Sequence, residues 1–261
     1  MKKVSKILIL SLFSGLLYLL PISVMAADEP GPVAEIWIVT AKTGYMGNLQ
    51  EAFKEHMAVR VKHGEPWNWQ TYVPVVGDDL NRIGIRHCCV NWADVDSYEH
   101  WDRSNPDVLA HWYAKVDPHI EKMEHYFERV DWSNSHWNEG ADSSRLYGVT
   151  EWAIKGGHGA DFAAAREKMS QIAINQGWAN TERNWAWMTT VGGRSTESIV
   201  IPYKNYADMA PGEESFFQFL SKHLGSEEAA GDLLKSLSAA SWGSSYTVWE
   251  HRPDLSMSKD G

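Results

Sequence analysis

The hydrophobic side chains of this sequence alternate in short runs and recur every three or four positions in longer ones, which predicts a mixture of strands and helices. A first strand is expected over 35–42, where Ile36 and Ile38 share one face. Residues 46–63 carry apolar side chains at helical spacing, and Gly64 follows as a stop. The remaining elements expected in this half are strands over 68–76 and 82–91, a helical region over 95–122 interrupted at Asn105-Pro106, and a strand over 126–132.

The same order of elements returns about 113 to 116 residues later in the chain. Asn91-Trp92-Ala93-Asp94 is matched by Asn205-Tyr206-Ala207-Asp208, and WQTYVPVVG at 69–77 is matched by WAWMTTVGG at 185–193. The elements expected in the second half are a strand over 148–155, a helix over 160–176, strands over 184–192 and 197–204, helices over 213–223 and 227–240, and a strand over 245–251. The pattern therefore predicts an internal repeat.

Each half has the order strand, helix, strand, strand, helix, strand, which is the ferredoxin-like βαββαβ arrangement. Helices cover one face of such a sheet, and the other face needs a partner sheet, which the second half can supply. The sequence thus predicts an α+β fold in which two tandem ferredoxin-like units pack their sheets into one α/β barrel. The expected boundaries are a first unit over 34–133, a polar linker over 134–146, a second unit over 147–252 and a frayed tail over 253–261.

In element order, in duplication and in the turn Asn-aromatic-Ala-Asp before an aromatic-rich helix (Tyr98, Trp101), the chain resembles the dimeric α/β-barrel superfamily in tandem-fused form. That group includes the antibiotic-biosynthesis-monooxygenase-like and NIPSNAP-like proteins. The resemblance covers roughly 34–252 and implies a central barrel whose lumen holds a small apolar molecule or haem. Because the superfamily hosts oxygenases, isomerases, haem enzymes and proteins without known activity, the fold alone does not define a function.

The first 26 residues have the pattern of a secretory signal peptide. Lys2, Lys3 and Lys6 precede a mostly apolar run over 7–20, and Val24-Met25-Ala26 places small residues where a signal peptidase cleaves. The apolar run is too short for a typical membrane span. We therefore expect a bacterial protein that is periplasmic or secreted after cleavage, without a stable membrane anchor.

The net charge restricts the classes of binding partner that we expect, and the two cysteines raise the question of a disulfide. Removing the three lysines takes the formal net charge from −10 to −13, which argues against a nucleic acid or an anionic membrane as partner. The two cysteines, Cys88 and Cys89, are neighbours in a predicted strand and point to opposite faces, so we expect free thiols rather than a vicinal disulfide.

The strand over 82–91 has a face that contains Ile83, Ile85 and His87, and this face is expected to meet the helices. Arg86 and Cys88 would then face the barrel lumen, where Arg86 could bind a ligand carboxylate or Glu151, or reach water at the barrel mouth. Glu151 takes the place that Ile38 has in the first half. In the lumen, burial would raise the pKa of Glu151, and the carboxyl could act as a general acid or base.

Tryptophan is abundant, with 14 residues in the chain. Trp69 lies on one predicted strand face, and Trp185 and Trp187 share a face in the second half. Such side chains either line a ligand pocket or form the core between sheet and helices. Metal and nucleophile motifs are missing: no HExxH, GxSxG or GxGxxG occurs.

Two functions remain open. The first is an exported barrel that binds a small apolar or amphipathic ligand in its lumen, with Arg86, Cys88, Trp69, Trp185 and Trp187 as candidate binding residues. The second is an oxygenase-like or isomerase-like enzyme with Glu151 and His87 as candidate catalytic residues. A haem-linked form of the enzyme would need a luminal histidine, and the sequence does not orient the helical histidines. The expected partner is a small molecule, and the barrel is expected to form within one chain or within a homodimer.

Overall fold

The computed structural model describes residues 31–138 and 140–257, in which eight strands form one closed antiparallel barrel. The predicted signal peptide therefore lies outside the described residues. Around the barrel the strand order is β1-β3-β2-β8-β5-β7-β6-β4. The described part of the chain also contains six α-helices, so the α+β class and the barrel expected from the sequence are confirmed.

The first four strands and three helices come from the first half of the chain. Their bounds are β1 Val33–Ala41, α1 Met46–Lys62, β2 Gln70–Val76, β3 Arg82–Val90, α2 Trp92–Ser104, α3 Pro106–His111 and β4 Ile120–Val130. A π-helical turn, Trp112–Val116, continues α3.

The second half supplies the other four strands and three helices. Their bounds are β5 Leu146–Ile154, α4 Gly159–Asn175, β6 Ala186–Val191, β7 Thr196–Tyr203, α5 Phe216–Leu224, α6 Glu227–Ala239 and β8 Ser241–His251. No helix among the described residues has the length and apolar character needed to cross a bilayer.

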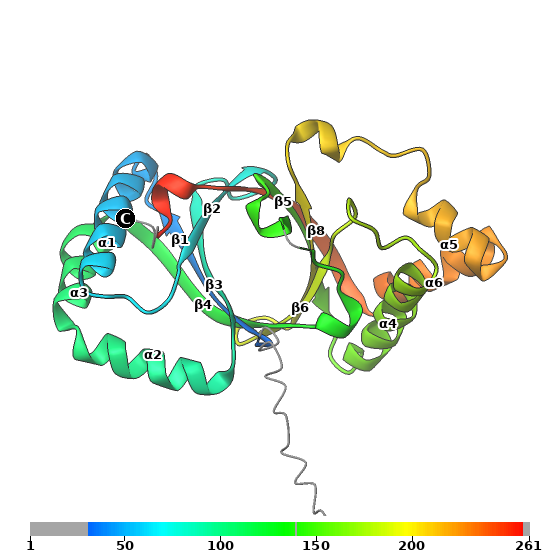
Figure 1. Ribbon diagram of the computed structural model, residues 1–261, viewed down its shortest axis with the longest axis horizontal. Coiled ribbons are helices and arrows are strands. Elements are labelled where there is room, and N and C mark those ends of the chain that lie inside the picture. The colour runs from blue at the N-terminus through cyan, green and yellow to red at the C-terminus, as the bar shows by residue number, and fades with distance from the viewer. Residues whose placement is uncertain (1–30, 139, 258–261) are drawn as a thin grey trace, which may run out of the picture.

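The helices form two layers on opposite sides of the barrel (Figure 1). Helices α1, α2 and α3 lie beside β1 to β4, and α4, α5 and α6 lie beside the strands of the second half. Each layer seals a separate apolar core against the outer face of the barrel, with Phe53 and Ile83 buried in the first core and Phe162 and Trp187 in the second. The inner face of the barrel is consequently left to a different set of side chains.

The repeated Asn-aromatic-Ala-Asp turn starts a helical segment in both halves. The backbone N–H of Asn91 donates to Asp94 Oδ2 at 2.8 Å at the start of α2. The corresponding Asn205 side chain accepts from the backbone of Ala207 and Asp208 at the start of a 3-10 turn. Both turns satisfy backbone N–H groups that a helix start leaves without partners, which explains why the sequence uses these residues.

Sequence expectations were wrong at the ends of several elements; strand β8, for example, begins at Ser241, four residues before the expected start at 245. Strand β4 begins at Ile120, whereas the helical region was expected to run to 122, because β4 pairs with β1 over the whole length of that strand. The segment after Pro253 was expected to fray, but Leu255 and Met257 are buried in the first core and the Met257 N–H donates to the Trp69 carbonyl at 2.9 Å.

Barrel closure depends on two contacts between the halves, β2 with β8 and β4 with β6. Strand β2, which lies at the edge of a single ferredoxin-like unit and contains Pro74, has neighbours on both sides in the closed barrel. The register shifts between Pro74 and Val76, and a proline without an N–H is tolerated at such an irregularity. The closed barrel leaves no free strand edge.

Candidate functional site

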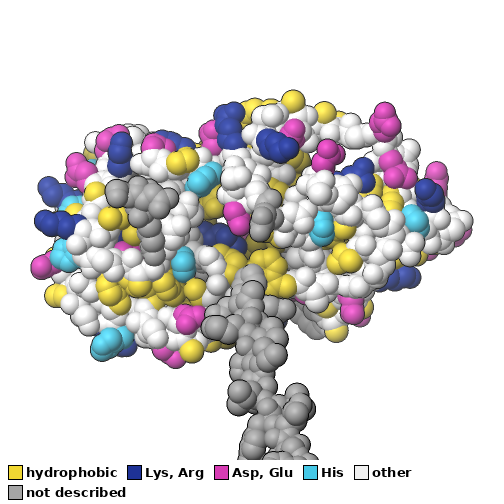
Figure 2. Space-filling model, viewed as in Figure 1, with side chains coloured by type: hydrophobic (Ala, Val, Ile, Leu, Met, Phe, Trp, Pro, Cys, Tyr) yellow, Lys and Arg dark blue, Asp and Glu magenta, His cyan; other side chains and the backbone are white. Residues whose placement is uncertain are grey.

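The inside of the barrel contains a cavity of about 850 Å³, which is the size of a small-molecule site. Its walls are mainly apolar side chains that alternate inward along the strands, and Figure 2 shows the molecule hollowed between its two halves with basic side chains inside. The apolar residues of the lumen include Ile36, Ile38, Val149, Met188, Val200 and Trp249. Polar groups are few and therefore define the chemistry of the site.

Arg86 faces the lumen from β3, as its alternation with Ile85 predicts. It lies opposite Ile36 of β1 and Gln70 of β2. Its positive charge influences the pKa of Tyr72, Glu128 and Tyr147, so these groups converge on it. Arg86 takes part in no ion pair within the described part of the chain, which leaves its guanidinium available to a ligand.

Glu128 is the second charged group at this end of the lumen. It lies on β4 between Ala34 of β1 and Thr190 of β6, is half-buried and lines the cavity. Burial raises the pKa of the Glu128 carboxyl to about 7, with Arg86 opposing the rise and Glu151 adding to it. A carboxyl poised near neutral pH can both accept and release a proton.

Glu151 lies in the lumen on β5, beside Val149, where the sequence placed it conditionally. Burial raises its pKa, the arginines Arg82 and Arg194 lower it, and Glu124 raises it further. The Arg82 guanidinium carbon lies 5.1 Å from the centre of the Trp249 ring. Glu151 is therefore a luminal carboxyl with charges of both signs in its surroundings, as Glu128 is with Arg86 and Glu151.

Two tyrosines line the cavity near Arg86. Burial raises the pKa of both Tyr72 and Tyr147, so their hydroxyls stay protonated and can donate. The Tyr147 hydroxyl donates to the carbonyls of Ala141 and Asp142 at 3.1 and 2.9 Å. The Tyr72 ring meets the Tyr147 ring edge-on with centres 5.4 Å apart.

Cys88 and Cys89 both line the lumen, and they are joined in a vicinal disulfide. The expectation of two free thiols was therefore wrong. The argument from opposite strand faces failed because it assumed a regular trans strand, whereas the peptide bond between the two residues is cis. The register of β1 against β3 also shifts at this point, between Val33 and Ala34.

The tryptophan candidates and His87 lie outside the lumen. Trp69 is buried in the first core, and Trp185 and Trp187 are buried in the second. Their indole N–H groups are used inside the protein; Trp187 Nε1, for example, donates to Ser170 Oγ at 3.0 Å. His87 points to the helical side of β3 and stacks on Trp67 with ring centres 4.5 Å apart.

Sequence reasoning missed Glu128, Tyr72 and Tyr147. A signal existed for Glu128, because Tyr126, Glu128 and Val130 alternate along the strand expected over 126–132. Assigning that face required the pairing of Ile36 with Tyr126, which fixes the register of β4 against the inward face of β1. Tyr147 could have been placed by alternation from Glu151, whereas Tyr72 depended on the pairing of β2.

The lumen does not fit a haem held by a histidine. None of the described residues that line it is a histidine, and the described residues contain no cluster of three or more metal-binding side chains. His56 and His111 lie on the helical side, where their Nδ1 atoms are 3.3 Å apart. No step is therefore assigned to haem in this site.

Comparisons with known proteins define the fold. No family model and no curated protein matches the sequence. A candidate monooxygenase from Lactobacillus acidophilus NCFM is 8% identical with a TM-score of 0.51, over 88% of this chain and 97% of that one. A candidate monooxygenase from Fusobacterium nucleatum is 10% identical with a TM-score of 0.52, over 88% and 96%. An anthrone oxidase-like protein is 10% identical with a TM-score of 0.50, over 87% and 92%. At 8–10% identity these similarities show a shared fold and nothing further.

Proposed function

We propose that the barrel lumen binds one small, mainly apolar molecule that carries an anionic or strongly polar oxygen. The observation that carries this proposal is the cavity of about 850 Å³ in which Arg86 stands without an ion pair among apolar walls. Arg86 is half-buried and its guanidinium has no ion pair, so an oxygen anion of a ligand that also excludes water from the cavity would be stabilised by it. Ile36, Val149 and Val200 would pack against the apolar body of the ligand.

The probe for this site is 1-anilinonaphthalene-8-sulfonate, an aromatic anion whose fluorescence reports apolar burial. We expect Arg86→Gln to weaken its binding about tenfold or more, because the variant loses a charge-assisted contact while keeping a side chain that can hydrogen-bond. Lys168→Gln on the exposed face of α4 is the matched control and should leave the dissociation constant unchanged. Equal binding by wild type and Arg86→Gln would contradict the proposal.

A second candidate function is an oxygenase-like or isomerase-like enzyme that moves a proton in this lumen. Glu128 favours it, because a carboxyl with a pKa of about 7 inside an apolar cavity is suited to general acid or base catalysis. Proteins named as monooxygenases and as anthrone oxidase-like share the fold, which makes an aromatic carbon acid a reasonable substrate class.

Oxygen uptake and product formation with anthrone test this candidate. Glu128→Gln is expected to lower turnover at least about 100-fold while the fold is retained, because the general base is removed. The same turnover measurement on Glu151→Gln shows which of the two carboxyls accepts and releases the proton. Absence of turnover in wild type would exclude this function for anthrone, and turnover that is unchanged in both variants would exclude these two carboxyls from the proton transfer.

The same proposal includes the organisation and location of the chain. The units 34–133 and 147–252, joined by 134–146, have the ferredoxin-like element order, and the segment 253–261 follows the second unit. Ile38 pairs with Gly84 in the first half, and Glu151 pairs with Ser198 in the second, which supports a tandem fusion of the kind expected from the NIPSNAP-like resemblance.

The basic and apolar segment over 1–26 supports export to the periplasm or beyond. A barrel closed within one chain supports a monomer, with a homodimer as the alternative.

A further inference from the structure

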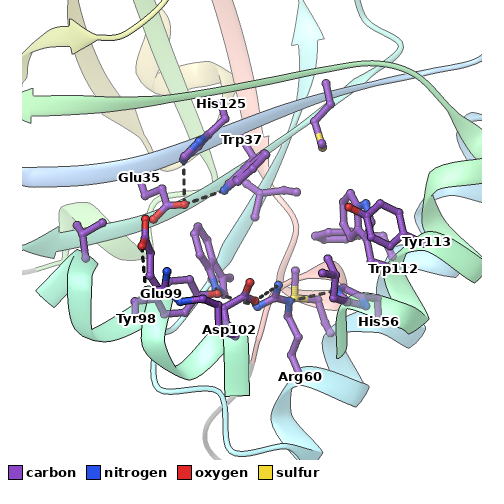
Figure 3. Close-up of a pocket in the computed structure, with 18 of the residues that line it drawn as sticks. Glu35, Trp37, His56, Arg60, Tyr98, Glu99, Asp102, Trp112, Tyr113 and His125 are labelled. Atoms are coloured by element: carbon purple, nitrogen blue, oxygen red, sulfur yellow. Dashed lines mark hydrogen bonds and ion pairs between the residues drawn. The ribbon is translucent and has the colours of Figure 1, made fainter. Parts of the chain in front are cut away.

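A second cavity, of about 520 Å³, lies on the opposite side of β1 from the lumen. It is enclosed by the outer faces of β1 and β4 together with α1, α2, α3 and the π-helical turn, and we call it the outer pocket. In Figure 3, Glu35, Trp37 and His125 stand on one side, Trp112 and Tyr113 on another, and Arg60 and His56 along a third. Because Glu35 and Trp37 point outward where Ile36 and Ile38 point inward, the two cavities are separate.

Aromatic rings form a large part of the lining of the outer pocket. Trp37 stacks on His125 with ring centres 3.9 Å apart, and His125 meets Phe127 edge-on at 5.2 Å. Trp112 and Tyr113 come from the π-helical turn, a local geometry that occurs frequently at functional sites. Figure 2 shows hydrophobic side chains gathered above α2. Two residues that line the pocket, Tyr113 and Met123, are 61% and 45% exposed. The entrance of the pocket is therefore apolar.

Glu35 places a carboxylate in this aromatic setting although its side chain is only 6% exposed. Its Oε1 accepts from Trp37 Nε1 at 2.9 Å and from His125 Nε2 at 3.0 Å. Its Oε2 has no hydrogen-bond partner within the described residues, yet it is not fully enclosed by them. One oxygen of a nearly buried carboxylate is therefore open to the pocket.

The positive charges near the pocket are already occupied by acidic partners. Arg60 is held by Glu65 and by the Tyr98 hydroxyl at 2.8 Å, and Arg103 by Glu99 at 3.4 Å. Burial, with Arg60 and His111 adding to it, lowers the pKa of His56 to about 3, so His56 is neutral. The Asp102 carboxylate also lies 3.9 Å from Arg60, so the acidic groups Glu35, Glu65, Glu99 and Asp102 outnumber the two arginines and the surroundings of the pocket are net negative.

The corresponding place in the second half is filled. Strand β5 lies between β7 and β8 as β1 lies between β3 and β4, and Gly148 of β5 pairs with Val248 as Glu35 pairs with Phe127. The Tyr246 hydroxyl occupies the position that a Cβ at residue 148 would take, and the Tyr203 ring is 3.0 Å from it. The open space beside Glu35 is therefore a feature of the first half and does not follow from the fold.

We propose that the outer pocket binds an organic ammonium cation, with Glu35 as its counter-ion and the aromatic rings of Trp37, Trp112 and Tyr113 as its walls. Aromatic faces attract quaternary and alkylated ammonium groups through the ring quadrupole, and the attraction grows when the cation is removed from water. A carboxylate with one free oxygen adds the charge complementarity that selects a cation over a neutral or anionic molecule of the same shape. This site is independent of the lumen and of the function proposed for it.

The test measures binding of three benzene derivatives to the full-length chain by calorimetry: benzyltrimethylammonium, benzyl alcohol and benzenesulfonate. The cation should bind more tightly than the other two, and Glu35→Gln should weaken it at least about tenfold while leaving benzyl alcohol unchanged. Tyr113→Leu, at an exposed position that tolerates change, should weaken the cation without disturbing the fold. Glu167→Gln on the exposed face of α4 and Arg86→Gln in the lumen are controls that should keep wild-type binding of the cation.

Two results would overturn the proposal. One is benzenesulfonate or benzyl alcohol binding as tightly as the cation. The other is wild-type affinity for the cation in Glu35→Gln and in Tyr113→Leu, both shown to be folded by circular dichroism.

Discussion

Glu128 shows how one position in the barrel sets both chemistry and stability. Its strand neighbours Ala34 and Thr190 leave the carboxyl inside the lumen, where water cannot solvate its charge as it does in the unfolded chain. Burial therefore raises its pKa from 4.5 to about 7. Between these two values the folded protein keeps a proton that the unfolded chain releases, so this group makes the protein less stable as pH rises.

We expect Glu128→Gln to remove that pH dependence. Below about pH 4.5 the carboxyl is protonated in both states, and variant and wild type should differ little. Above pH 7 the variant should be more stable than the wild type. Its advantage in free energy of unfolding should be about 3 kcal/mol larger than any difference seen at low pH. Urea unfolding at pH 4, 6 and 8 measures this, with Glu167→Gln on the exposed surface of α4 as the control. A difference that is the same at all three pH values would contradict the assigned environment.

Strand alternation was the part of the site that the sequence could predict. It placed Arg86 and Cys88 on the face opposite Ile85, and it placed Glu151 beside Val149. It could not find Glu128, because the face of β4 is set by pairing with β1, a contact across some 90 residues. The tryptophans were ambiguous for the same reason: which face a strand turns to its helices is decided by tertiary packing.

At the scale of elements, the boundaries that failed are those where tertiary contacts replace local preference. The residues over 117–122 have no strong strand pattern, yet β4 begins at Ile120 because β1 extends far enough to pair with it. The segment 253–257 is polar at several positions, yet it packs beside α1 and β2. Long helices with clear periodicity, such as α1 and α4, were predicted to within one residue at either end.

The C-terminal segment should contribute measurably to stability. Leu255 is 2% exposed in the first core, and its carbonyl accepts from Thr71 Oγ1 at 3.0 Å. Leu255→Ala is therefore expected to lower the free energy of unfolding by about 2–5 kcal/mol, through lost burial and the cavity that remains. Leu80→Ala, at a side chain that is 49% exposed, is the control and should change stability by less than about 0.5 kcal/mol. Equal, small effects in chemical unfolding would mean that the segment is frayed after all.

At the scale of the whole molecule, the two halves are joined by strand pairing and by a nearly buried charge cluster. Arg166 of α4 contacts Asp131, which follows β4, at 2.8 Å and also pairs with Glu197 of β7. The side chain of Arg166 is 11% exposed. Because Asp131 belongs to the first half and Arg166 to the second, this cluster ties the halves beside the β4–β6 contact.

Removing the arginine should leave two acidic groups close together in a poorly hydrated place. Arg166→Met is expected to lower the free energy of unfolding by about 3–5 kcal/mol. The two carboxylates would remain in a poorly hydrated place without the positive charge that offsets their loss of hydration. Lys235→Met removes an exposed ion pair with Asp232 on α6 and should cost less than about 1 kcal/mol. Guanidinium unfolding of the two variants compares them directly, and similar effects would contradict a structural role for the cluster.

The most direct test of the lumen as a ligand site is native mass spectrometry of the purified protein with 1-anilinonaphthalene-8-sulfonate, comparing wild type with Val149→Trp. Val149 lines the cavity between Tyr147 and Glu151, so a tryptophan there should fill space that the ligand needs. We expect a one-to-one complex in wild type and its loss in a folded Val149→Trp variant. A bare wild-type chain, or equal complex in both proteins, would contradict the proposal that the lumen binds a small molecule.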